Sequence, residues 1–134
     1  MTTIESQRVV VNAPQPEVFE FLSDLNNYKV LFPEDRISDW EATETSCQFK
    51  IQGTATIALV FDKSTPNSEI NLVSGEKSPF PFTLNIYLEE PEDSQTKGWL
   101  VFNGEMNMML KMMVEKPLTN LFNYMAEQVK KQYD

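Results

Sequence analysis

The last part of the chain, residues 106–133, constrains the fold more than any other segment. At about 100° per residue, one arc of a helix built from this segment is apolar and the opposite arc is polar. The apolar arc holds Leu110, Val114, Leu118, Leu121, Phe122, Met125 and Val129. This pattern predicts a long C-terminal helix that lies against an apolar surface.

The first turns of this predicted helix break the pattern, because Met108, Met109, Met112 and Met113 surround its axis. A helix that is apolar all round has to be covered by protein, by a partner or by a ligand. Flexible methionines suit core packing, the lining of an adaptable pocket or an intermolecular contact. Pro117 removes one helical hydrogen bond, so we expect a kink or break there, or a helix that begins at this residue.

The front of the chain predicts a strand followed by a short helix. Consecutive β-branched residues, Val9 to Val11, favour a strand over residues 3–12. Pro14 and Pro16 end it, and apolar residues at helical spacing then predict a helix over residues 16–25. Residues 28–32 are expected to form a second helical turn before Pro33.

From Ile37 onward the apolar residues alternate with polar ones, which is typical of strands with one buried face. The predicted strands cover residues 37–43, 46–51, 54–62, 69–73, 83–89 and 99–105, with a turn at Gly53 before the third. Antiparallel strands joined by short loops form a twisted sheet whose apolar face needs a cover. The C-terminal helix is the only predicted element long enough to supply it.

Composition limits the classes of function. The chain has 134 residues, which predicts one domain over residues 1–134, and its net charge of −9 disfavours nucleic acid and anionic lipid as partners. No apolar run is long enough for membrane insertion, and the first residues lack the pattern of a secretory signal. With Cys47 as the single cysteine, no intramolecular disulfide can form, and we expect a cytoplasmic protein.

The sequence offers few residues that are suited to catalysis or to metal binding. The chain has no histidine, which removes the commonest general base and the usual zinc and non-haem iron ligands. Asp62 and Glu105 are carboxylates at the ends of predicted strands, and the acidic run from Glu89 to Asp93 is typical of a solvated loop. We therefore expect no catalytic residue, no metal and no cofactor.

The segment VVVNAPQPEVFEFLSDLNNY carries a family resemblance. Its strand, the turn Asn12-Ala13-Pro14, then Val18 and Phe19 in a helix that ends near Asp24, together with the order of elements, resemble the START-like superfamily. This superfamily, also called SRPBCC or polyketide cyclase-like, includes the birch pollen allergen family. The resemblance implies an α+β helix-grip fold, in which a seven-stranded antiparallel sheet wraps around a long C-terminal helix and leaves a cavity between them. Members bind lipids, sterols, polyketides or plant hormones, and some are enzymes.

On this basis we expect noncatalytic binding of a small hydrophobic, lipid-like or polyketide-like molecule in that cavity. Alternation turns Phe49, Phe61, Phe82 and Phe102 toward the helix. Tyr28, Phe32 and Trp40 lie in the least regular part of the chain, where we expect the entrance to the cavity. The expected ligand-binding residues are Tyr28, Phe32, Trp40, Phe49, Phe61, Phe82, Phe102, Met106, Met109, Met113 and Leu121.

Three further interpretations remain open at this point. Arg36 could pair with a ligand acid or with its neighbours Glu34 and Asp35. The methionine surface could make the chain a protein-interaction module or a homodimer. A cyclase-like or hydrolase-like enzyme that uses carboxylates and water would need a buried carboxylate with a raised pKa in the pocket.

Overall fold

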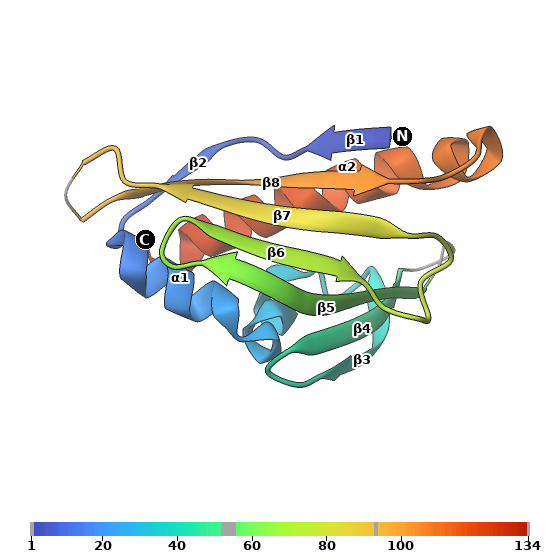
Figure 1. Ribbon diagram of the computed structural model, residues 1–134, viewed down its shortest axis with the longest axis horizontal. Coiled ribbons are helices and arrows are strands. Elements are labelled where there is room, and N and C mark those ends of the chain that lie inside the picture. The colour runs from blue at the N-terminus through green and yellow to red at the C-terminus, as the bar shows by residue number, and fades with distance from the viewer. Residues whose placement is uncertain (1, 52–55, 93, 134) are drawn as a thin grey trace.

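A computed structural model describes residues 2–51, 56–92 and 94–133 of the protein (Figure 1). Its elements are β1 (Thr2–Glu5), β2 (Val9–Val11), α1 (Gln15–Ser23), the 3₁₀ helix η1 (Leu25–Leu31), β3 (Ile37–Ala42), β4 (Ser46–Ile51), β5 (Thr56–Thr65), β6 (Glu69–Ser74), β7 (Phe82–Glu89), β8 (Thr96–Gly104) and α2 (Met108–Gln132). The predicted α+β order is confirmed. The predicted turn at Gly53 and the predicted strand start at residue 54 lie outside the described residues.

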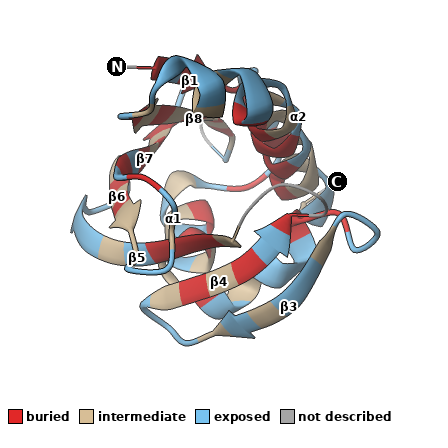
Figure 2. Cartoon of the chain, turned by 90° about the vertical axis from the view of Figure 1, so that its right-hand side faces the viewer, coloured by how far each residue is buried: buried red, intermediate tan, exposed pale blue. Residues whose placement is uncertain are grey.

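The strands form one antiparallel sheet in the order β1-β8-β7-β6-β5-β4-β3, and β2 also pairs with β8. Since β1 and β2 pair with successive parts of the same strand, they take the place of one strand of the expected seven. Figure 2 shows the sheet curling from β1 and β8 round to β3, with α2 on its inner side. The helix-grip architecture implied by the sequence is confirmed.

The first strand is interrupted at Ser6, where we expected a continuous strand over residues 3–12. The buried Ser6 donates its backbone N–H to the carbonyl of Leu100 at 2.9 Å, and its hydroxyl accepts the Leu100 N–H at 2.9 Å. Gln7 then turns away from the sheet toward α2. Its N–H donates to Asn123 Oδ1 at 2.7 Å, and its side-chain amide donates to Glu127 Oε1 at 2.8 Å.

The core lies between the sheet and the inner face of α2. Phe49, Phe82 and Phe102 are buried there, as alternation predicts. Phe61 is only half-buried, and directly after it the pairing of β5 with β6 shifts its register, between Phe61 and Lys63. A register shift of this kind turns the following side chains out of strict alternation.

Helix α2 is continuous from Met108 to Gln132 and runs through Pro117 without a break. It begins at Asn107, whose side chain accepts the N–H of Leu110 at 2.9 Å, an N-cap that satisfies one free donor of the first turn. The exposed fractions of Met108, Met109, Met112 and Met113 are 72%, 72%, 79% and 53%. Core packing, one of the three interpretations of these methionines, is therefore wrong.

Candidate functional site

A pocket that opens to solvent lies between α2 and the segment where η1 leads into β3. Its volume is about 550 Å³, within the range typical of small-molecule sites. We call it the α2–β3 pocket. It is lined by Pro33, Asp35, Arg36, Ile37, Ile51, Lys116, Pro117, Asn120, Leu121 and Tyr124. Several of these residues are exposed, so the pocket opens directly to solvent.

Helical spacing explains the α2 wall of the pocket. Lys116 and Pro117 are followed one turn later by Asn120 and Leu121, and after another turn by Tyr124. Residues three and four apart lie on the same side of a helix, so these five form one face. Leu121 is buried at the base of this face, while Lys116, Asn120 and Tyr124 are exposed at its edge.

The opposite wall comes from the turn after η1 and from the ends of two strands. The N–H of Arg36 donates to the carbonyl of Pro33 at 3.1 Å, a turn that brings Asp35 and Arg36 to the pocket. Ile37 pairs directly with Ile51 across β3 and β4. This pair supplies the apolar part of the wall.

Two cationic side chains line the pocket, Arg36 and Lys116, together with one acid, Asp35. Among the described residues the single ion pair is that of Lys111 with Glu115, at 3.9 Å. The pairing of Arg36 with Glu34 or Asp35, one of our two interpretations, is therefore not formed within 4.0 Å. Since neither Arg36 nor Lys116 forms an ion pair with a described residue, both can bind a carboxylate or another polar group of a ligand.

Most residues expected to bind ligand are placed elsewhere. Leu121 lines the α2–β3 pocket, whereas Tyr28, Phe32, Phe49, Phe82 and Phe102 are buried among core side chains. Trp40 is half-buried and stacks on Phe49 with ring centroids 5.9 Å apart. Phe61 and Met106 are half-buried at the core boundary, and Met109 and Met113 project into solvent.

Tyr28 illustrates why an amphipathic aromatic residue need not face a ligand. Its ring is fully buried, and its hydroxyl donates to the carbonyl of Leu22 at 2.8 Å. Burial, with a smaller contribution from the nearby Cys47, raises the pKa of this hydroxyl above its usual value. Because the polar head already has a partner within the chain, it does not need one from a ligand.

Sequence reasoning missed most of the pocket. The α2 part carries a visible signal, since Pro117 and Tyr124 recur at helical spacing with Leu121, at the edge of the apolar arc. Ile37 and Ile51 were predicted as the first and last residues of separate strands, and only the register of β3 with β4 brings them together.

The interior between sheet and helix is otherwise closely packed over the described residues. An apolar cavity of about 30 Å³ lies among side chains of β2, α1, η1, β7, β8 and α2, including Val11, Leu22 and Met125. That volume holds about one water molecule, and an apolar lining keeps such a space dry. We expected the ligand in a cavity between the sheet and the C-terminal helix, but the space found there among the described residues holds only about one water molecule. The α2–β3 pocket lies instead at the edge of the helix and sheet.

A third pocket, of about 410 Å³, lies against β4, β5 and the segment after β6. It includes Cys47, which is buried. Burial raises the pKa of the Cys47 thiol to about 12, so this thiol stays protonated and a poor nucleophile at neutral pH.

Acidic clusters do not assemble in the part of the chain that the structure describes. No three His, Cys, Asp or Glu side chains come together there as metal ligands would. Asp62 and Glu105 are exposed and lie outside the α2–β3 pocket. Within the same residues, no helix combines the length and apolar character that crossing a membrane requires.

Comparison with known proteins gives a match of structure without a match of sequence. No protein-family model matches the chain, and no curated protein matches it. Norcoclaurine synthase from Thalictrum flavum superposes with a TM-score of 0.76 at 13% identity, over 98% of this chain and 93% of that one. A START superfamily protein from Mycobacterium smegmatis gives 0.68 at 12% identity, over 97% and 98%. The two-domain aromatase/cyclase BexL gives 0.72 at 12% identity, over 98% of this chain and 46% of its own length.

At identities this low, the likeness concerns the fold. It extends over nearly the whole chain and agrees with the element order and with the position of α2. The chain therefore has the START-like helix-grip fold, and its structural neighbours are START and SRPBCC proteins.

Proposed function

We propose that the protein is a noncatalytic binder of a small hydrophobic molecule, lipid-like or polyketide-like, which enters the α2–β3 pocket. The observation that supports this most directly is a 550 Å³ pocket with an apolar base and two cations that form no ion pair with a described residue. Proteins with this fold typically bind hydrophobic ligands. We propose that this protein acts as a single domain in the cytoplasm.

The pocket has an apolar region and a cationic region, and we expect the ligand to have two matching parts. The apolar part packs on Leu121, Ile37 and Ile51, where each buried methylene contributes about 0.8 kcal/mol. A polar or acidic end lies toward Arg36 and Lys116, whose donors it satisfies. The net charge of the chain, −9, and Asp35 oppose an acidic ligand, but two cations beside one apolar wall give an acidic group two local positive partners.

A direct test combines native and denaturing mass spectrometry of the purified protein, with the bound molecule identified after extraction. Asn120→Trp fills the pocket from an exposed position, and Met112→Trp adds the same bulk outside it. We expect the ligand to be absent from Asn120→Trp and retained by Met112→Trp. Equal retention by both variants would contradict the proposed site.

A second candidate, a homodimer or protein-interaction module, is favoured by the exposed methionines at the start of α2. Light scattering separates it from ligand binding. A dimer that dissociates when Met108 and Met112 are both replaced by Lys would favour the interface. A monomer in both proteins would remove this candidate.

A further inference from the structure

The face of α2 that lines the α2–β3 pocket continues beyond it toward the start of the helix. At about 100° per residue, Met113 and Met109 lie roughly 40° and 80° around the axis from Pro117, on the side of Lys116. The arc of α2 that lines the pocket extends from Lys116 to Leu121 around the axis, and both methionines fall within it. Met112 and Met108 lie roughly 140° and 180° from Pro117, outside this arc. We call Met109 and Met113 the methionine stripe.

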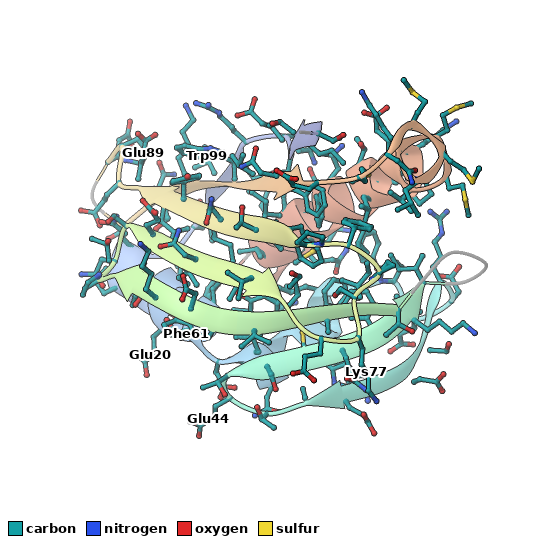
Figure 3. The ribbon with its side chains drawn as sticks, turned by 45° about the vertical axis from the view of Figure 1, so that its right-hand side comes forward. Glu20, Glu44, Phe61, Lys77, Glu89 and Trp99 are labelled. Atoms are coloured by element: carbon teal, nitrogen blue, oxygen red, sulfur yellow. The ribbon has the colours of Figure 1, made fainter. Side chains whose placement is uncertain are left out.

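The methionine stripe is apolar and open. Its two side chains are 72% and 53% exposed, while Leu110 and Val114 beside them turn toward the core. Sulfur-bearing side chains project into solvent around the first turns of α2 in Figure 3. Exposed apolar side chains that continue a pocket wall are typical of a binding surface.

We propose that the ligand of the α2–β3 pocket is an elongated apolar chain whose outer part lies along the methionine stripe. This inference rests on the proposed function and narrows the ligand from any small hydrophobic molecule to a chain-like one. Met113 and Met109 extend the wall by about 6 and 12 Å beyond Pro117. Unbranched methionine side chains adapt to a flexible chain without a fixed shape.

The dimensions of the stripe favour a chain over a protein partner. Met109 and Met113 lie one turn apart, and even with the exposed Met108 and Met112 beside them they cover less than the roughly 800 Å² per partner of a stable protein interface. Lys116 borders the stripe on one side, and the ion pair of Lys111 with Glu115 lies further round the same helix. A single hydrocarbon chain fits a strip with these borders.

Saturated fatty acids of increasing length, used as probes below their micelle concentrations, test this arrangement by calorimetry. We expect wild-type protein to bind octanoate, dodecanoate and hexadecanoate with rising affinity, by about twofold per added methylene, since full burial gives roughly fourfold. Replacing both Met109 and Met113 by Gln removes most of the gain from dodecanoate to hexadecanoate and leaves octanoate binding within twofold of wild type.

The matched control replaces Met108 and Met112 by Gln. These residues have the same chemistry, the same helix turns and similar exposure, but they lie outside the pocket arc. We expect this variant to keep the full chain-length dependence. Equal losses in the two variants, or an affinity that stops rising at octanoate in wild type, would overturn the elongated ligand and leave the pocket intact. If wild type binds none of the three acids, the proposed function and this inference fail together.

Discussion

Helix α2 contains two regions with similar apolar residues and opposite surroundings. Residues 114–129 bury Val114, Leu118, Met125 and Val129 against the sheet, whereas the methionines of residues 108–113 remain more than half exposed. Helix α2 contacts β1, β2, β8 and η1, and all of its buried side chains lie between Val114 and Val129. Apolar composition alone therefore does not decide burial in this helix.

The largest expected effect tests this contrast with one residue type. Met125→Ala removes a side chain that is 2% exposed and leaves a cavity, so we expect the free energy of unfolding to fall by about 2–5 kcal/mol. Met112→Ala, at 79% exposure, should change it by less than about 0.5 kcal/mol. Urea denaturation measures both, and similar losses would show that the two regions do not differ.

The core on which the buried region of α2 packs also holds ionisable groups, among them Cys47 of β4, and these make the free energy of unfolding depend on pH. Burial raises the pKa of Cys47 from 9.0 to about 12, so the folded state binds more protons than the unfolded state between these values. This contribution to stability is complete below about pH 9 and is lost as pH rises toward 12. We expect a loss of about 1.4 kcal/mol per pH unit at most.

Cys47→Ala provides the control for this alkaline loss. Its free energy of unfolding should fall less steeply than that of wild type from pH 9 to pH 10.5, measured by urea denaturation at each pH. The comparison uses slopes, because the substitution itself shifts stability at every pH. Identical slopes would contradict the assignment to Cys47.

A smaller effect concerns the cations at the pocket. Replacing Arg36 and Lys116 together by Gln should weaken dodecanoate binding about fivefold, which corresponds to about 1 kcal/mol for exposed charges. Dodecanol, which has the same chain and no charge, should bind both proteins equally. A variant with both Lys63→Gln and Lys97→Gln, neither of which lines the pocket, removes the same two charges and controls for the change in net charge. Equal weakening of acid and alcohol would show that these side chains act through shape alone.

The smallest effect on stability comes from oxidation. Dilute peroxide should convert Met108, Met109, Met112 and Met113 to sulfoxides well before Met125, because access to solvent controls the reaction. Peptide mass spectrometry follows each site, and the free energy of unfolding should change by less than about 0.5 kcal/mol. Early oxidation of Met125 would mean that the buried region opens readily.

The fold was largely predictable from periodicity. Alternation in residues 83–89 and the helical stripe from Val114 to Val129 each follow the burial that the structure gives them. The interruption of the first strand was not predictable. The Ser6 hydroxyl accepts the N–H of Leu100, a hydrogen bond that exists only because β8 lies beside Ser6 in the fold. Local sequence does not specify a partner 94 residues away.

The site was much less predictable. Aromatic side chains such as Phe49 and Phe102 were expected to bind ligand, but they pack on Phe32, Phe82 and Phe122 with ring centroids 4.4 to 5.4 Å apart. Sequence patterns identify which side chains face inward, but not whether the facing side chains fill the interior. That depends on volumes contributed by distant segments.

The hydrogen bonds from Gln7 to Asn123 and Glu127 fasten the later half of α2 to the break in the first strand. The bonded residues are 116 and 120 positions apart in sequence, so the two bonds fix this part of α2 relative to the start of the chain. The α2 wall of the α2–β3 pocket runs from Lys116 to Tyr124 and so reaches into this fixed part of the helix. The position of that wall therefore depends on Gln7, a residue near the start of the chain.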